Sequence, residues 1–382
     1  MRVAILTNNL PSFNKVLAEG LQRMFRGIGV EATVHYDGHD RLRRFDRSSA
    51  GLAGRLWHEV NLVPFLATLR GFEVIVLVST IPKAFLRTDH AHLETLRRCI
   101  PGVPIVNYDV SLLPTQPRWV KVLREGNHPW VRTGGNFGLE RFDWYLTAAS
   151  RSYSPLPKGE WPCTVIGLNL DDGTLYPDQK DEFLAVIDFE QPEYFKERAD
   201  QIMALEETST KYVVLHGSYS IDDIRKLYRR TSMFFLASPD SFGLPICELQ
   251  ACGAYILAPH EDWCPAHWIA DGQGSANAGK LSPNFVIYRD RTMLIRQLAR
   301  IRSEHNAQHI VQTFLHHHPE FFFGDSGALA SFCHQVRSGA IHSRLHSSHA
   351  FLLEPVRDED AAKESGYRLS NGEETLPTGY RR

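Results

Sequence analysis

Apolar and polar positions along the first 36 residues follow the order of a strand, a helix and a second strand. Val3–Thr7 is a short, mostly apolar run, which is typical of a buried parallel strand. A polar turn over 8–12 follows, and a helix then keeps its apolar residues on one face until Gly27. A second strand is predicted over Glu31–Tyr36. Strand, helix and strand at this spacing predict a right-handed crossover and a parallel sheet.

The same alternation continues to about residue 165. Helical stretches are predicted at 51–70 and 87–99, and the further strands are Val74–Ser79, Val103–Tyr108 and Trp144–Thr147. Residues 111–141 are rich in Pro, Gly, Arg and Trp and predict a long loop, a kind of segment that is usually functional. Its large side chains could contact a sugar or a phosphate, or pack the loop itself: they are Arg118, Trp119, Trp130, Arg132 and Arg141.

A second α/β series begins after residues 164–177, where a short predicted strand runs into the Asn, Asp, Gly and Pro of a turn. The predicted strands are Phe183–Asp188, Lys211–His216, Met233–Ala237 and Tyr255–Ala258, and the predicted helices lie at 192–207, 220–230, 245–252 and about 290–315. We therefore predict an α/β protein with two Rossmann-like domains whose parallel sheets face each other across a cleft.

The predicted domains are an N-terminal one over 1–165 and a C-terminal one over 166–335. Residues 336–354 form a candidate crossover segment, and the polar tail 355–382 is predicted to be disordered. A length of 382 residues accommodates two such domains, and 43% hydrophobic and 23% charged residues are ordinary for a soluble protein.

Cysteine content and apolar runs bear on the compartment. Six cysteines without a CxxC pair are too sparse for a disulfide scaffold and favour a reducing cytoplasm. No run of about 18 apolar residues predicts a membrane span, although peripheral contact stays open.

Charge is unevenly distributed over the two halves. Residues 1–160 carry 21 Lys and Arg against 14 Asp and Glu, whereas the remainder carries 21 against 30. The basic half could favour an anionic acceptor or an anionic membrane surface, or reflect ordinary surface variation. The acidic half does not resemble a nucleic-acid binder, so nucleic acid is an open but less favoured partner.

The segment from Met233 to Ala258 carries the clearest chemistry. A buried strand leaves the sheet at Ser238 and enters a loop in which Gly243 allows close approach of the backbone to a ligand. Pro245 suits the first turn of the helix that follows. Unpaired N–H groups and a positive helix end at the carboxyl edge of a parallel sheet predict an anion site that suits a diphosphate.

Two acids flank this loop at a spacing of eight residues. Asp240 would face a sugar, and Glu248, in the helix, could accept hydrogen bonds from ribose hydroxyls. The alternative is a solvent-facing loop acid and an exposed helix acid. The two readings differ in whether the loop faces a ligand.

The run Asp240-Ser-Phe-Gly-Leu-Pro-Ile-Cys-Glu248, followed by Leu-Gln-Ala-Cys-Gly253, resembles the signature of family 4-type retaining glycosyltransferases of the GT-B fold. The resemblance covers about 165–260. It implies that Asp240 contacts the donor sugar, that the loop Ser241, Phe242, Gly243 and Leu244 holds the sugar-diphosphate, and that Glu248 binds the ribose. It also implies transfer from a nucleoside-diphosphate sugar, of UDP or GDP type, to an acceptor hydroxyl, with retention and without metal or cofactor.

The sequence departs from this family pattern at three places, the first being Asp240, which stands where the family usually has glutamate. The family's first donor-domain strand leads to an Arg and a Lys that neutralise the diphosphate, whereas Asp188 and Glu190 follow the strand here. Lys196 and Arg198 are candidate substitutes. In the N-terminal half, Asp109 stands near the place of a family His and is a candidate base or hydroxyl-orienting group, or else a turn residue.

Three further groups have two readings each. His216 and Gly217 follow a strand and either line the nucleotide pocket or form a turn, and Asn8 and Asn9 either touch donor or acceptor or form a turn. The run His316-His-His318 has the composition of a metal site, but adjacent helical residues point in different directions, so no metal is predicted.

Two other functions remain compatible with the sequence. One is a non-catalytic GT-B-like protein that binds a sugar nucleotide or acts as a scaffold. Asp188 and Glu190, which stand where the diphosphate-binding Arg is expected, favour this alternative. The other is a nucleotide-sugar epimerase. For a glycosyltransferase, the acceptor is open among a glycan, a lipid-linked intermediate and a modified nucleic-acid base.

Overall fold

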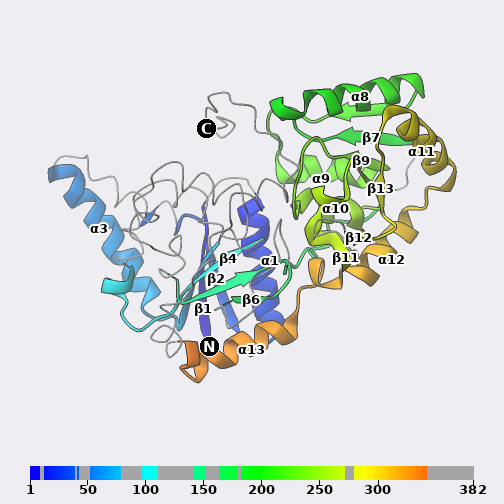
Figure 1. Ribbon diagram of the computed structural model, residues 1–382. Helices are drawn as coiled ribbons and strands as arrows, with labels where there is room; N and C mark the ends of the chain where they lie inside the picture. The colour runs from blue at the N-terminus through cyan, green and yellow to red at the C-terminus, as the bar shows by residue number, and fades with distance from the viewer. Residues whose placement is uncertain are drawn as a thin grey trace, which may run out of the picture.

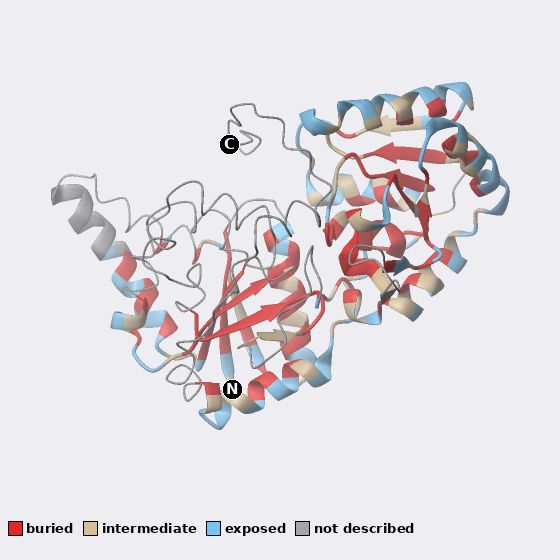
Figure 2. Ribbon diagram, in the orientation of Figure 1, coloured by how far each residue is buried: buried red, intermediate tan, exposed pale blue. Residues whose placement is uncertain are grey.

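The computed structural model describes residues 1–8, 13–38, 41–42, 52–78, 96–110, 142–150, 163–178, 182–271 and 279–341. These residues build two parallel sheets with helices packed against them, one sheet from each half of the chain (Figure 1). The inner strands of both sheets are buried, most edge strands are only partly buried, and most helices keep an exposed face (Figure 2).

The N-terminal sheet has six strands in the order β2-β1-β3-β4-β5-β6, and every pair of neighbours is parallel. The strands are β1 Arg2–Leu6, β2 Glu31–His35, β3 Val74–Val78, β4 Ile105–Asp109, β5 Trp144–Thr147 and β6 Cys163–Val165. Side chains alternate along β1. Val3 and Ile5 therefore pack with helix α1 (Phe13–Gly27), and Ala4 and Leu6 pack on the other face with α3 (Leu52–Leu69).

The C-terminal sheet has five strands in the order β8-β7-β9-β10-β13, again all parallel. The strands are β7 Leu184–Ile187, β8 Lys211–Val214, β9 Met233–Phe235, β10 Tyr255–Ala258 and β13 Phe285–Ile287. The helices are α8 Phe195–Glu207, α9 Ile221–Arg230, α10 Leu244–Ala251, α11 Arg291–Glu304 and α12 Ala307–His317. A small antiparallel pair, β11 Trp268–Asp271 and β12 Gly279–Leu281, lies beside this sheet.

Both sheets share one strand order. In each, the first strand in sequence lies between the second and the third, so the chain winds outward in both directions from one point. This topological switch point lies between β1 and β3 in the N-terminal sheet and between β7 and β9 in the C-terminal sheet. Ligands of open parallel sheets bind outside the carboxyl ends of the strands at such points. The fold therefore marks one candidate ligand position in each half.

The chain connects the two halves twice, and the two connections are hydrogen-bonded to each other. Leu168 N–H donates to the Glu320 carbonyl at 2.8 Å, and Asp325 N–H donates to the Ile166 carbonyl at 2.7 Å. Between them, Gly167 has a φ of 73°, and a Cβ there would lie 2.2 Å from the Glu320 carbonyl oxygen. Only glycine fits this crossing because both its backbone conformation and the space exclude a side chain.

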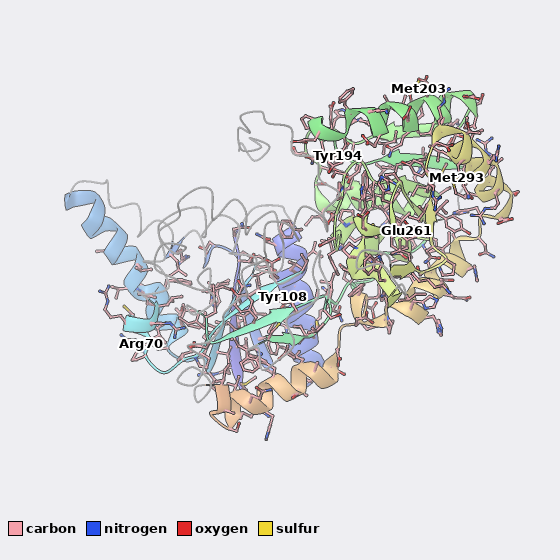
Figure 3. All side chains as sticks on the ribbon, viewed as in Figure 1. Arg70, Tyr108, Tyr194, Met203, Glu261 and Met293 are labelled. Atoms are coloured by element: carbon pink, nitrogen blue, oxygen red, sulfur yellow. The ribbon has the colours of Figure 1, made fainter. Side chains whose placement is uncertain are left out.

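The N-terminal sheet contacts these connections from one side. The buried hydroxyl of Tyr108, on β4, donates to the Gly167 carbonyl at 2.9 Å (Figure 3). Helix α13 (Ser326–Arg337), whose N-cap Asp325 accepts from Ala328 N–H at 2.8 Å, then packs on α1 and β6. The chain thus returns to the N-terminal half after building the C-terminal sheet (Figure 1).

The predicted α/β class and the two parallel sheets are confirmed. One predicted element is wrong: the helix expected over about 290–315 is two helices, because Asn306 caps α12 through a hydrogen bond from His309 N–H at 3.0 Å. The short strand predicted at the start of 164–177 is β6, whereas β13 and the β11–β12 pair were not predicted.

The domain boundaries and the cleft remain predictions. Helix α13, which packs on the N-terminal half, lies mostly ahead of the predicted crossover at 336–354, and residues from 342 onward lie outside the described ranges. Among the helices that the structure describes, none has the length and apolar character that a membrane crossing requires.

Candidate functional site

The switch point of the C-terminal sheet gathers the polar loops that follow β7, β8 and β9. Asp188 follows β7, and its N–H donates to the Phe235 carbonyl at 3.0 Å, which holds the loop against β9. Phe189 contacts Tyr219 edge to face, with ring centroids 6.1 Å apart, and so joins the loops after β7 and β8. Asp240 lies in the loop after β9, close enough for its charge to act on Asp188.

The Asp240 loop turns around its own carboxylate. Gly243 N–H donates to Asp240 Oδ1 at 2.9 Å, and the Phe242 N–H also bonds this side chain. Asp240 is exposed to solvent, yet the protein around it raises the pKa of its carboxyl, while the two N–H groups act in the opposite direction. The amides expected to hold a diphosphate are therefore directed at Asp240 in this structure.

Gly243 is required by its geometry. Its φ is 58°, and a Cβ would lie 2.6 Å from Ile246 Cδ1 and 3.1 Å from Asp240 Oδ2. Any other residue would strain the backbone and collide with the helix that the loop begins. The close approach of this backbone to a ligand stays a prediction.

Phe242 points inward and anchors the loop. It is 1% exposed, stacks on His267 at a centroid distance of 5.8 Å and meets Phe321 edge to face at 5.0 Å. The Phe242 carbonyl accepts from His267 Nε2 at 2.6 Å, and a carbonyl only accepts, so this nitrogen carries the proton. Burial, with a contribution from His318, lowers the pKa of His267 to about 3, so the ring is neutral.

Helix α10 begins with an available donor. Leu244 N–H has no hydrogen-bond partner within the part of the chain that the structure describes, because it is the first N–H of the helix and Gly243 has no side chain to cap it. The positive end of the helix dipole adds to this donor. Leu244 N–H is the one amide of the predicted set that is free to bind an anion.

Asp188 is a half-buried acid. Burial raises the pKa of Asp188 to about 7; the negative charge of Asp240 adds to this rise, while Phe189 N–H and Arg198 oppose it. Near neutral pH the side chain is therefore about half protonated. A protonated Asp188 carries no charge and can donate a hydrogen bond, so it does not repel a phosphate as a carboxylate would.

Arg198, on α8, is the cation of this edge. Its nearest acid is the exposed Glu190, at 3.9 Å from Nη1, and Nη1 is buried without a hydrogen-bond partner among the described residues. An unused buried N–H beside Asp188 suits an anionic ligand. Arg198 acts on Asp188, whereas Lys196 is exposed and forms no ion pair with any described residue, so its role stays a prediction.

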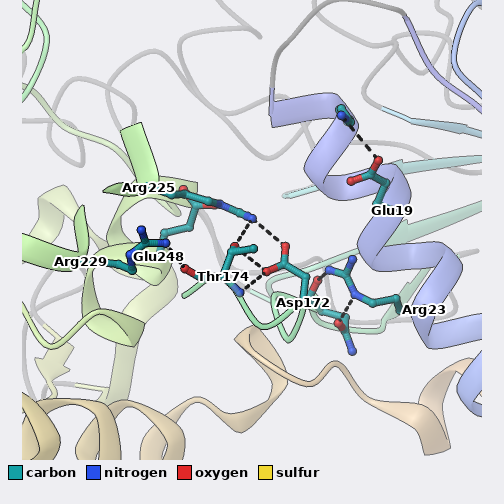
Figure 4. A network of polar contacts seen from close by, with 9 residues as sticks. Glu19, Arg23, Asp172, Thr174, Arg225, Arg229 and Glu248 are labelled. Carbon is teal, nitrogen blue, oxygen red and sulfur yellow. Dashed lines mark hydrogen bonds and ion pairs between the residues drawn. The ribbon is translucent and has the colours of Figure 1, made fainter. Parts of the chain in front are cut away.

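Glu248 is buried rather than exposed, and it is paired. Its Oε1 accepts from Arg225 Nε at 2.9 Å and from Arg225 Nη2 at 2.6 Å (Figure 4). Within the described residues Oε2 makes no hydrogen bond, and it is not among the fully buried atoms without partners. One oxygen of the carboxylate is thus held by Arg225, and the other remains for a ligand.

Arg225 also joins Glu248 to the connection between the two halves of the chain. Arg225 Nη1 donates to Asp172 Oδ2 at 2.6 Å and to Thr174 Oγ1 at 2.8 Å (Figure 4). Burial opposes the charge of Arg225, but Glu248 and Asp172 outweigh it and raise its pKa, so the guanidinium stays charged. Burial also acts against the charge of Asp172, but hydrogen bonds from Thr174 and Arg225 outweigh it and lower the pKa of this carboxyl.

Helix α1 reaches the same connection from the N-terminal half. Arg23 donates from Nε to Asn169 Oδ1 at 2.8 Å and from Nη2 to the Asn169 carbonyl at 2.7 Å (Figure 4). Burial lowers the pKa of Arg23, while Asp172 is the largest influence in the opposite direction. Glu248 is thus linked through Arg225 and Asp172 to the connecting segment that Arg23 of α1 also binds.

His216 and Gly217 lie at the carboxyl end of β8 and are exposed. His216 Nδ1 donates to the Val214 carbonyl at 3.1 Å, which leaves Nε2 as an acceptor in the neutral ring. Gly217 has a φ of 68° with open space around it. Neither is joined to Asp188 or Asp240 by a described contact, so their role stays a prediction.

The N-terminal candidates are placed as follows. Asp109 is 7% exposed, and its Oδ1 accepts from Val110 N–H at 2.7 Å, as a turn residue does. Asn8 is buried, with no partner for Oδ1 in the described part of the chain. Asn9 and the Arg and Trp of 111–141 lie outside the described residues.

The histidine run packs rather than converging on one point. His318 is buried, stacks on Phe321 at 4.9 Å and contacts the His267 carbonyl through Nε2 at 3.1 Å. No group of His, Cys, Asp and Glu within the described ranges has the arrangement of a metal site.

Three residues of the site were missed in the sequence. Arg225 and Asp172 carry no local signal, because each is one charged residue among several in its segment. His267 likewise follows no motif. Asp188 was noted only as a departure, although an acid directly after a buried strand is itself the signal of a site at the strand's carboxyl end.

Comparisons with known proteins agree with the fold. No family model and no curated protein matches the sequence. Among solved structures, the catalytic domain of starch synthase IV from Arabidopsis thaliana, bound to ADP and acarbose, is similar with a TM-score of 0.54 and 10% identity, over 89% of this chain and 99% of that one. A structure assigned to a UDP-N-acetylglucosamine 2-epimerase from Listeria monocytogenes is similar with a TM-score of 0.53 and 13% identity, over 89% and 96%. The predicted GT-B fold is therefore confirmed.

Proposed function

We propose that this protein is a glycosyltransferase that moves a sugar from a nucleoside-diphosphate sugar to an acceptor hydroxyl, with retention. The C-terminal half would bind the donor and the N-terminal half the acceptor. The observation that carries the proposal is the switch point between β7 and β9, where Arg198 Nη1 and Leu244 N–H are donors without a partner among the described residues and Glu248 Oε2 is an acceptor without one. The starch synthase with ADP bound has the same fold, which supports a nucleotide as a ligand of this protein.

Each group then has a role. Leu244 N–H, the start of α10 and Arg198 would hold the diphosphate, and Glu248 Oε2 would accept from the ribose hydroxyls. Asp240 would contact the donor sugar, and its amide partners Phe242 and Gly243 would be released to the phosphate if the carboxylate turns toward the sugar. His267 keeps the Phe242 peptide oriented for that exchange.

The transfer itself depends on positioning and on stabilising the leaving group. The acceptor oxygen forms a bond to the anomeric carbon, the bond from that carbon to the diphosphate breaks, and its electron pair leaves with the diphosphate. The hydroxyl proton passes to a phosphate oxygen or to a base, for which Asp109 remains the candidate. Half-protonated Asp188 allows the diphosphate to sit beside an acid that would otherwise repel it.

The decisive experiment is calorimetric binding of a panel of UDP-, GDP-, ADP- and dTDP-sugars to the wild type and to Glu248→Gln. Gln keeps an oxygen for Arg225 but removes the carboxylate, so we expect at least tenfold weaker binding of the preferred nucleotide without loss of folding. Glu248→Ala is a poorer probe because it would leave Arg225 without its main partner. Equal affinity of the wild type and Glu248→Gln would remove the ribose assignment.

Product analysis separates the alternatives. Sugar transfer that requires an added acceptor is the expected outcome. Turnover of a donor without any acceptor, with inversion at a ring carbon, would instead identify an epimerase. Binding without turnover would identify a non-catalytic protein, for which Asp188 at the diphosphate position is the structural argument.

A further inference from the structure

The switch point of the N-terminal sheet presents polar side chains that the protein itself leaves unused. Thr7 Oγ1, Asn8 Oδ1 and Asn14 Oδ1 are buried and have no hydrogen-bond partner within the described residues. The three residues are 0%, 9% and 6% exposed. Buried polar atoms without partners are few in folded proteins and cost stability, so three within eight positions of sequence require an explanation.

The fold places them at one edge. Val3 and Ile5 on β1 pack against the buried face of α1, and Thr7 continues the same alternation one step beyond the strand. On α1, Asn14 precedes Leu17 and Ala18 by three and four positions and shares their buried face. The apolar layer between β1 and α1 therefore ends in Thr7 and Asn14, and Asn8 follows at the same carboxyl end.

This edge is where a ligand of the N-terminal sheet belongs. Helix α1 packs on both β1 and β3, so its first turn lies over the switch point between these strands. Arg23 lies on the same helix, nine residues, or about 14 Å, beyond Asn14. Arg23 grips Asn169 beside the Asp172–Arg225–Glu248 chain (Figure 4), so α1 connects this edge to the candidate donor site.

The chemistry of the three groups selects the ligand. None of them is charged, and a carboxamide or a hydroxyl both donates and accepts hydrogen bonds, as a sugar hydroxyl does. A phosphate could only accept from them and would find no cation in the group. We infer that Thr7, Asn8 and Asn14 form a subsite for the hydroxyl groups of a neutral carbohydrate. This rests on the proposed function: the subsite would hold the acceptor, and it favours an uncharged sugar despite the basic N-terminal half.

The test uses variants in which a binding role and a structural role have opposite consequences. Thr7→Val and Asn14→Leu remove the unused polar atoms with little change in shape. Because these atoms cost stability, each variant should raise the melting temperature, by about 2–4 °C. The matched control is Thr231→Val, a fully buried threonine whose hydroxyl donates to the Leu227 carbonyl at 2.8 Å, and this variant should melt lower.

Binding is measured by saturation-transfer NMR and calorimetry with methyl glycosides of glucose, mannose, galactose and N-acetylglucosamine, and with glucose 6-phosphate as the charged counterpart. We expect the wild type to bind at least one neutral glycoside more tightly than the phosphate ester. Thr7→Val and Asn14→Leu should each weaken that binding about tenfold, and Thr231→Val should not change it.

Three results would overturn the inference: no neutral glycoside binds, both variants bind as the wild type does, or both variants melt lower. UDP and ADP binding, measured on the same variants, keeps this test apart from that of the proposed function. Glycoside binding that depends on Thr7 and Asn14 in a protein that binds no nucleotide would retain the subsite and reject the glycosyltransferase.

Discussion

Arg225 donates two hydrogen bonds to a single carboxylate oxygen of Glu248, from Nε at 2.9 Å and from Nη2 at 2.6 Å. Its remaining nitrogen, Nη1, binds Asp172 and Thr174. One buried cation therefore orients the acid that we assign to the ribose and ties it to the connection between the two halves. Changes at Arg225 should affect both stability and nucleotide binding.

Arg225→Met should lower the free energy of unfolding by about 3–5 kcal/mol, because it leaves the buried carboxylate of Glu248 without its partner. Urea denaturation followed by circular dichroism measures this. Arg229→Met is the matched control: Arg229 lies one turn further along α9, and its pair with Asp178 at 3.4 Å is partly exposed. That loss should stay below about 1 kcal/mol. Equal losses in the two variants would contradict the special role of Arg225.

Asp188→Asn should stabilise the protein at alkaline pH. The folded pKa of Asp188 is about 7 and its ordinary value is 3.8, so the folded state binds more protons between these values and stability falls as pH rises. At pH 8 the variant should be more stable by about 1–2 kcal/mol, a range discounted because the group keeps some solvent contact. Near pH 4 the difference should vanish. Unfolding curves from pH 4 to 8 test this, and a difference that is independent of pH would refute the raised pKa.

The same pKa predicts the pH dependence of donor binding. Nucleotide affinity of the wild type should fall as pH rises through about 7, because ionised Asp188 repels the diphosphate. In Asp188→Asn this fall should be absent. Calorimetry with the preferred nucleotide at pH 6 and pH 8 measures both proteins, and a parallel fall in both would assign the pH dependence to another group.

Gly243→Ala should disrupt the loop between β9 and α10, to which we assign the donor diphosphate. A Cβ at this position meets Ile246 at 2.6 Å in addition to the strain of a positive φ, so we expect a cost of about 2–3 kcal/mol and strongly reduced nucleotide binding. Gly102→Ala is the control, because Gly102 has a φ of 80° but nothing within 4 Å of the added Cβ. It should cost about 1 kcal/mol and leave nucleotide binding unchanged. Thermal unfolding and calorimetry distinguish the two.

His267→Phe should remove a source of acid sensitivity. The folded pKa of His267 is about 3 and its ordinary value is 6.5, so the unfolded state binds more protons between these values and stability is lost as pH falls. The slope is at most about 1.4 kcal/mol per pH unit, and it is opposite in sign to that of Asp188. The variant should show a flatter profile from pH 6.5 to 4, together with a looser Phe242 loop. An unchanged slope would mean that His267 is not the buried neutral group.

Hydrophobic periodicity in the sequence determined most of the fold. Short apolar runs predicted β1, β7, β9 and β10, because strands buried on both faces need apolar residues throughout. The start of α10 at Leu244, one residue ahead of the predicted start at Pro245, also followed from local chemistry, because the fixed φ of proline suits the first turn of a helix. The position of the loop between β9 and α10 at the carboxyl end of a strand was also predicted, because this loop directly follows a buried parallel strand in the sequence.

Only the tertiary structure decided which side chains meet. Arg225 binds Asp172, 53 positions away, and Glu248, 23 positions away, whereas Thr7 Oγ1 and Asn14 Oδ1, at the other switch point, have no partner among the described residues. The charge of Asp240 acts on Asp188 because β7 and β9 are neighbours in the sheet. The physical reason is that periodicity specifies which face a residue occupies, whereas hydrogen bonds, ion pairs and pKa values depend on distances of a few ångströms between segments remote in sequence.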